Sequence, residues 1–184
     1  MLYGTQVILV NHADHLFCYG LNMADLVCEV SFFGLELNQK FRKTNSVYVG
    51  IPVDLENLDF LVRPVDVKNY HFLSVGSNIK YEPYGSHSFP ALVDFILRNN
   101  NNVRFTIVGP KFFDFWWMKL RFKYPRRLNL RKRIPYNLYE DLFLNADLYI
   151  DSFPMTGGTA LPEARSFGVA VTGLLNGSSG YSTT

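Results

Sequence analysis

The sequence has little cysteine, little net charge and no long apolar run. Its two cysteines, Cys18 and Cys28, are expected to be free thiols in a reducing compartment, because the start of the chain shows no secretory signal. No stretch approaches the roughly 18 apolar residues that a membrane-spanning helix needs. The net charge of +2 indicates no partner selected by charge alone. We therefore expect a cytoplasmic protein without a transmembrane segment.

Apolar and aromatic residues are plentiful, and their spacing predicts an α/β fold. Short apolar runs alternate with segments of helical period, which is typical of a Rossmann-like parallel sheet covered by helices on both faces. We expect strands at 6–10, 25–30, 46–51, 71–75, 103–108, 148–150 and 169–172. We expect helices at 35–42, 89–97, 138–144 and 161–167.

The pattern of elements divides the chain into two parts. Residues 55–68 resemble a linker, with mixed charge, Pro64 and no clear period. We therefore place one unit with its linker at 1–67 and a second unit at 68–184. The first part has few elements for a sheet of its own, and the second stops just after a strand. Both observations suggest a piece of a larger protein.

The stretch 147–163 carries the clearest chemical signal. A buried strand ends at Asp151, a turn with Gly157, Gly158 and Thr159 follows, and a helix then begins. A glycine turn at a helix start exposes backbone N–H groups that suit a phosphate. Glu163, one turn into the helix, could accept hydrogen bonds from a ribose diol. An ordinary turn with a solvated glutamate is the alternative.

This stretch resembles the donor site of a known enzyme family. The pattern Asp-x-Phe-Pro-x-x-Gly-Gly-Thr-x-x-x-Glu, followed by Ala-x-x-x-Gly-Val-Ala-Val, is similar to the signature of GT-B glycosyltransferases, especially O-GlcNAc-transferase-like and related bacterial sugar transferases. The resemblance implies that Gly157, Gly158 and Thr159 hold the diphosphate of a nucleotide sugar, UDP-linked by family analogy. It implies that Glu163 holds the ribose. Met155 stands where many retaining members carry a second glutamate, so a mechanism based on that residue is not carried over.

The resemblance extends over nearly the whole chain but covers only the later part of such an enzyme. Residues 11–17, 24–27 and 50–54 look like the tail of a GT-B N-terminal domain and its crossover. His71 onward looks like most of the C-terminal, donor-binding domain. The expected fold is therefore the C-terminal half of a GT-B enzyme with a remnant of the N-terminal half.

Four further residues are assigned by the same resemblance. Gly76 and Lys80 follow the strand at 71–75, where the family places a lysine on the donor diphosphate; a solvated loop lysine is the alternative. Pro135 or Tyr139 precedes or begins the helix at 138–144, where the family holds the nucleotide base. A core position for the Tyr139 ring is equally consistent with the pattern.

Histidines follow the first strand. His12 or His15 could act as the general base that an inverting transferase needs, with the Asp14 carboxylate orienting it. A structural role is the alternative. A metal site from these three residues is the weakest reading, because the spacing without a further ligand is poor evidence. No metal is expected, and no cofactor other than the donor substrate.

The segment 111–133 combines aromatic rings with charge of one sign. It holds nine of the chain's 18 basic residues and a single acid, Asp114. One interpretation is a helix that packs its aromatic residues on the sheet and presents a solvated basic face. Another is peripheral contact with the inner face of a membrane, and the least favoured is binding of single-stranded nucleic acid.

These observations predict a glycosyltransferase, or a fragment of one, that transfers a sugar from a nucleotide-sugar donor to a glycan or lipid-linked acceptor in polysaccharide biosynthesis. The first alternative is a nucleotide-sugar-binding module without turnover. An NAD-dependent oxidoreductase ranks lower, because neither Gly4 nor Gly76 begins a Gly-x-Gly-x-x-Gly pattern.

Overall fold

The computed structural model describes residues 4–12, 18–53, 68–111, 113–135 and 138–174. The chain forms two compact units that divide between Pro52 and Val53. The boundary predicted from the sequence lies after residue 67. The stretch 54–67 before it lies outside the described residues. Within the described ranges no helix has the length and apolar character to cross a membrane.

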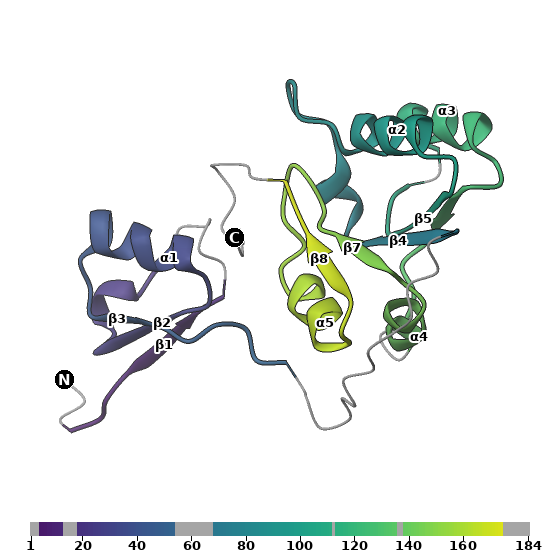
Figure 1. Ribbon diagram of the computed structural model, residues 1–184. Helices are drawn as coiled ribbons and strands as arrows, with labels where there is room; N and C mark the ends of the chain where they lie inside the picture. The colour runs from purple at the N-terminus through teal and green to yellow at the C-terminus, as the bar shows by residue number, and fades with distance from the viewer. Residues whose placement is uncertain (1–3, 13–17, 54–67, 112, 136–137, 175–184) are drawn as a thin grey trace. The chain divides into compact units, whose positions relative to one another are not determined.

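The N-terminal unit is a small parallel sheet with one helical segment on it (Figure 1). Its strands lie in the order β1-β2-β3, so the middle strand pairs with both neighbours. The strands are β1 (Ile8–Asn11), β2 (Leu26–Glu29) and β3 (Ser46–Tyr48). A 3-10 turn (Leu21–Met23) precedes β2, and helix α1 (Phe32–Leu37) with a π-helical turn (Asn38–Arg42) connects β2 to β3.

The helical segment differs from the single helix predicted at 35–42. Helix α1 begins at Phe32, because the Ser31 hydroxyl caps it by accepting a hydrogen bond of 2.9 Å from the Gly34 amide. The segment then widens into the π-helical turn and ends at Lys43, which adopts a left-handed φ of 55°. The prediction followed the apolar period and missed the cap, which has no period.

A buried carboxylate connects the layers of this unit. Glu29 is fully buried and accepts hydrogen bonds from the side-chain amides of Asn11, at 2.8 Å, and Asn38, at 3.2 Å. Arg42 lies 3.8 Å from the same carboxylate. Asn38 also accepts from the Thr44 amide and hydroxyl, at 3.0 and 2.9 Å. The network fixes the π-helical turn against β1 and β2.

The C-terminal unit is a five-stranded parallel sheet in the order β6-β5-β4-β7-β8 (Figure 1). Its strands are β4 (Tyr70–Val75), β5 (Val103–Val108), β6 (Leu128–Arg131), β7 (Leu148–Ile150) and β8 (Ala170–Thr172). Its helices are α2 (Phe89–Asn99), α3 (Phe115–Lys123), α4 (Tyr139–Leu144) and α5 (Ala160–Ser166). A 3-10 turn (Asn78–Tyr81) follows β4.

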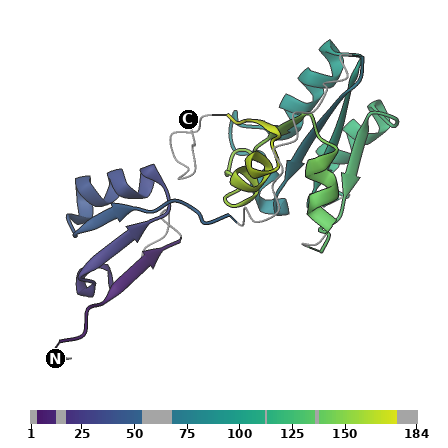
Figure 2. The same cartoon turned by 60° about the horizontal axis from the view of Figure 1, so that its bottom comes forward.

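Each face of this sheet has its own apolar core. Helices α2 and α3 pack on one face, where Phe89, Phe105 and Trp117 are fully buried. Helices α4 and α5 pack on the other, around Phe143 and Leu161 (Figure 2). The central strands β4, β5 and β7 are therefore mostly buried, as parallel strands covered by helices on both faces should be. The predicted α/β fold with a Rossmann-like sheet is confirmed.

The aromatic and basic segment 111–133 contains both a helix and a strand. Helix α3 contributes Trp117 and Leu120 to the core, so part of the predicted packing on the sheet is present. Strand β6 was not predicted. Its side chains alternate, with Leu128 and Leu130 buried, while Asn129 and Arg131 are exposed. This period of two is the sequence signal that identifies a half-buried strand.

Candidate functional site

The strand order creates a switch point between β4 and β7. From β4 the chain builds β5 and β6 on one side, and it then crosses back to place β7 on the other side of β4. The loops that leave these two neighbouring strands therefore diverge, and ligands of open α/β sheets bind in the crevice at such a point. The loop after β4 carries Gly76 and Lys80, and the loop after β7 carries 151–159.

Lys80 links these two loops directly. Its amino group donates a hydrogen bond of 2.8 Å to the carbonyl oxygen of Gly157. The 3-10 turn positions it, since the Lys80 amide bonds to the Ser77 carbonyl at 3.0 Å. Burial lowers the pKa of Lys80, and the nearby Asp151 carboxylate opposes that effect. A partly buried ammonium group thus lies between the loops that the sequence assigned to one site.

Asp151 fixes the loop after β7 through hydrogen bonds to its backbone. Its carboxylate is buried and accepts hydrogen bonds from the amides of Ser152, at 2.9 Å, and Gly157, at 2.8 Å. The Tyr149 hydroxyl lies 3.3 Å from the same oxygen and 3.2 Å from the Val75 carbonyl. Burial raises the pKa of Asp151 to about 6, against the effect of these hydrogen bonds and of Lys80. From the sequence, Asp151 is the end of a strand and the first residue of the donor-site pattern, and its hydrogen bond to the Gly157 turn was not predicted.

Two of the predicted glycines are required by close packing. A side chain at Gly157 would overlap the Asp151 carboxylate. A Cβ at Gly76 would lie 3.2 Å from the Tyr81 hydroxyl and 3.3 Å from the Ser152 Cβ, which is tighter than ordinary contact. These glycines therefore allow the loops to approach each other.

Gly158 has a different requirement. Its φ of 74° lies in the left-handed region that favours glycine, and a Cβ there would stand 3.8 Å from the Lys80 amino group. The residue thus turns the backbone beside the ammonium group. This is the geometry that a close approach of a ligand to the turn would use.

Thr159 and Glu163 lie where the turn becomes helix α5. Thr159 precedes the first helical residue, is exposed and makes no capping hydrogen bond with its side chain. Glu163 is half-buried in the first turn, and its amide bonds to the Thr159 carbonyl at 3.0 Å. Both side chains belong to the same short segment as the Gly157 turn.

Tyr139 comes close to Glu163 from the neighbouring helix α4. Burial raises the pKa of the Tyr139 hydroxyl, Arg133 opposes this, and the Glu163 carboxylate adds to it, so the three groups lie within range of electrostatic interaction. The Tyr139 ring is half-buried and stacks on Phe143, with centroids 6.4 Å apart. It therefore combines a packed face with a position near the site. Pro135 is exposed in the loop that precedes α4.

His12 and His15, the two residues predicted as the general base, belong to the N-terminal unit. His12 follows β1 and has an exposed side chain, whereas His15 and Asp14 lie outside the described residues. Among the described residues, the hydrogen-bond partners of Asp151 belong to the C-terminal unit. The base role of His12 or His15 stays a prediction. Among the described residues, no group of three His, Cys, Asp or Glu side chains could hold a metal ion.

A groove of about 690 Å³ lies at the other end of strands β4 and β5. It is lined by residues near the amino ends of β4 and β5 and by β6, including Arg104 and Arg131. Ligand sites of open α/β sheets form at the carboxyl ends instead. We therefore place the candidate site at the Lys80 and Gly157 contact.

Comparison with known proteins finds no matching family model and no matching curated protein. Solved structures do match, among them three GT-B glycosyltransferases. The crystal structure of TarM aligns with a TM-score of 0.65 and 14% identity, covering 93% of this chain and 36% of TarM. The GtfA/B complex aligns with a TM-score of 0.61 and 15% identity, covering 92% of this chain and 38% of the matched one.

A mutant O-GlcNAc transferase from Thermobaculum terrenum also matches, with a TM-score of 0.50 and 16% identity, over 81% of this chain and 30% of the transferase. The chain thus spans about a third of the length of these three structures, between 30% and 38%. Identities this low are informative about the fold alone. The resemblance stated from the sequence is confirmed at that level, and the fold of this chain is that of the GT-B glycosyltransferases.

Proposed function

We propose that this chain is the donor-binding part of a glycosyltransferase that takes a UDP-linked sugar at the carboxyl ends of β4 and β7. The observation that carries the proposal is the 2.8 Å hydrogen bond from Lys80 to the Gly157 carbonyl, which joins the two loops at the switch point of a GT-B fold. The sugar goes to a glycan or lipid-linked acceptor in polysaccharide biosynthesis.

Lys80 is suited to hold the diphosphate of the donor. An ammonium group has three donor hydrogens, and the bond to the Gly157 carbonyl uses one of them. The other two can bind phosphate oxygens. Because burial lowers the pKa of Lys80, an anion beside it would favour its charged form. That charge would then stabilise the diphosphate as it leaves the sugar.

The rest of the nucleotide can extend from this point across α5 toward α4. The backbone at Gly158 and the Thr159 hydroxyl would bind phosphate oxygens, and the Glu163 carboxylate would accept from the ribose diol. Tyr139 lies within electrostatic range of Glu163, as a base attached to that ribose requires. Tyr139 or Pro135 would contact the nucleotide base. His12 or His15 would act as the general base that removes the proton of the acceptor.

Calorimetric titration with UDP, GDP and NAD tests the donor site. We expect UDP to bind, and Lys80→Met and Glu163→Gln each to weaken it by ~1–3 kcal/mol, as the loss of charge-assisted hydrogen bonds should. Lys119→Met is the matched control, because this lysine is exposed on α3, across the sheet from α5. A folded chain that binds none of the three nucleotides would contradict the proposal.

Turnover separates the enzyme from a binding module. A chain that binds UDP and also hydrolyses or transfers the donor sugar is catalytic by itself. Binding without any release of UDP from the donor would favour the alternative, a nucleotide-sugar-binding module. That outcome is compatible with a chain that spans about a third of the structures it matches.

A further inference from the structure

Helix α3 has an inner apolar stripe that the fold uses. Trp117 and Leu120, together with Tyr124 just after the helix, are buried and follow the spacing i, i+3, i+7. Lys123 and Tyr124 also bind Asp94 of α2, at 2.7 and 2.8 Å, so this side of α3 is fixed against its neighbour. One such stripe is what a surface helix of a globular unit needs.

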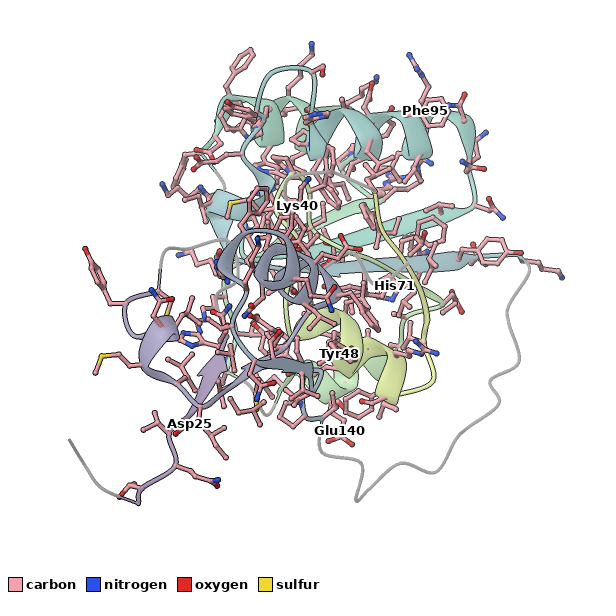
Figure 3. All side chains as sticks on the ribbon, turned by 90° about the vertical axis from the view of Figure 1, so that its left-hand side faces the viewer. Asp25, Lys40, Tyr48, His71, Phe95 and Glu140 are labelled. Atoms are coloured by element: carbon pink, nitrogen blue, oxygen red, sulfur yellow. The ribbon has the colours of Figure 1, made fainter. Side chains whose placement is uncertain are left out.

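The same helix has a second apolar stripe that faces solvent. Phe115, Met118 and Phe122 repeat the spacing i, i+3, i+7, offset by two residues and so by about 200° from the inner stripe. The exposed fractions of Phe115 and Phe122 are 77% and 81%, and Phe113 just before the helix is 88% exposed. Neighbouring α2 has a single buried stripe and one exposed ring, Phe95, labelled in Figure 3. An apolar stripe of this size on the outside of a helix indicates a binding surface.

The charges around the outer stripe are mostly positive, with Asp114 beside Phe115 as the one acid of the segment. Lys119 lies within it, four residues after Phe115 and three before Phe122. Arg121 lines a hollow of about 630 Å³ with Phe113, Met118, Phe122 and Pro125. The segment 111–133 holds nine basic residues against one acid, and Lys111 and Arg126 on either side of the helix are exposed.

We infer that the outer stripe of α3 docks on the surface of an anionic lipid bilayer. Phenylalanine and methionine side chains enter the boundary between head groups and acyl chains, while lysine and arginine extend their charged ends to the phosphates. The charge complementarity selects an anionic lipid surface, because the basic residues alternate with the rings along one face. The inference goes beyond the donor site and does not rest on it, since α3 and α5 cover opposite faces of the sheet.

Co-sedimentation with vesicles tests the inference. The chain is mixed with vesicles of phosphatidylcholine containing phosphatidylglycerol, and with vesicles of phosphatidylcholine alone. We expect binding to the anionic vesicles, and weaker binding as salt is raised from about 0.1 M to about 1 M. The double variant Phe115→Ser, Phe122→Ser should lose binding by at least about tenfold, and Lys119→Ser should reduce it on anionic vesicles only.

Tyr84→Ser is the matched control. Tyr84 is 77% exposed, the same as Phe115, and lies in the loop before α2 without a basic neighbour in sequence. The control should bind vesicles like the unmodified chain. Circular dichroism checks that each variant is folded, and the UDP titration of the double variant should be unchanged.

Three results would overturn the inference. One is the absence of binding to anionic vesicles. Another is equal vesicle binding by the double variant and the Tyr84 control. The third is vesicle binding that survives the double substitution while self-association, measured by light scattering, or binding to a single-stranded oligonucleotide is lost. The outer stripe would then be a protein or nucleic-acid surface.

Discussion

The amide of Gly157 donates a 2.8 Å hydrogen bond to the carboxylate of Asp151, six residues earlier in the chain. The carbonyl of the same glycine accepts from Lys80 at the same distance. Gly157 is therefore held through both its amide and its carbonyl group, by Asp151 at the end of β7 and by Lys80 from the loop after β4. The position of the turn depends on a buried carboxylate at the first position of the same sequence pattern, six residues before the glycine.

Adding a methyl group at Gly157 should disrupt this arrangement. The new Cβ would overlap the Asp151 carboxylate, so we expect Gly157→Ala to lower the free energy of unfolding by ~1–3 kcal/mol. Gly173→Ala is the control, because a Cβ there would meet the Asp151 Cβ at an ordinary 3.5 Å. The control should stay within about 0.5 kcal/mol.

Urea unfolding followed by tryptophan fluorescence gives the measurement. Trp116 and Trp117 are the two tryptophans of the sequence, and both lie in α3 of the C-terminal unit. The signal therefore reports the unit that contains Gly157. Equal stability of the two alanine variants would show that the turn moves freely to accept a side chain.

The stability of the C-terminal unit should fall as the pH rises past the pKa of Asp151. Burial raises the pKa of this carboxyl group from 3.8 to about 6 in the folded chain. Between these two values the folded state binds more protons than the unfolded state. The contribution of Asp151 to the free energy of unfolding is therefore largest below the unfolded pKa and is lost as the pH rises through the folded pKa. The total decrease in the free energy of unfolding is roughly 3 kcal/mol.

Asp151→Asn isolates this contribution, because an amide does not titrate. We expect the free energy of unfolding of the unmodified chain, minus that of the variant, to decrease from about pH 4 to about pH 7. Asp114→Asn serves as the control, since Asp114 makes no capping hydrogen bond at the start of α3. A constant difference across this range would mean that Asp151 keeps an ordinary pKa.

The sequence predicted the C-terminal unit well where burial dictates pattern. The predicted strands at 103–108 and 148–150 coincide with β5 and β7, because a strand covered on both faces is mostly apolar. The helix predicted at 161–167 lies one residue from α5. The resemblance in 151–163 also led to the GT-B fold that the solved structures share.

Other features are long-range contacts that no local pattern records. The contact of Lys80 with Gly157 spans 77 residues and depends on β4 lying beside β7. Asp151 ends a strand in the sequence, and its role emerges only when Gly157 folds back onto it. The π-helical turn at Asn38 likewise depends on Glu29 of the preceding strand. Sequence patterns report burial, whereas these polar contacts depend on the finished topology.

Removing the Asn38 side chain should weaken the N-terminal unit. Asn38 is fully buried, donates to Glu29 and accepts twice from Thr44, so Asn38→Ala removes three hydrogen bonds from this network. We expect a loss of ~2–4 kcal/mol, measured by hydrogen exchange of the amides in β2 and β3. Asn45→Ala, which removes one exposed hydrogen bond to the Asp25 carbonyl, is the control. An unchanged exchange rate in the Asn38 variant would contradict the role of the network.

The Tyr139 ring should contribute to binding of the base and not of the phosphates. Its ring stacks on Phe143 and lies within electrostatic range of Glu163. Tyr139→Ala should weaken UDP by ~1–3 kcal/mol, the typical contribution of one ring stacked on one base. Tyr139→Phe keeps the ring and should bind UDP nearly as well.

Titration with inorganic pyrophosphate shows whether the Tyr139 ring stacks on the nucleotide base or only packs within the protein. Pyrophosphate has no base, so its affinity should be the same for the Tyr139→Ala variant and the unmodified chain, whereas Lys80→Met should weaken both ligands. If Tyr139→Ala weakens pyrophosphate as much as UDP, the ring acts by packing α4 against α5 through Phe143, which is stacked on both Tyr139 and Phe167. The base would then bind at Pro135, the exposed residue of the loop before α4.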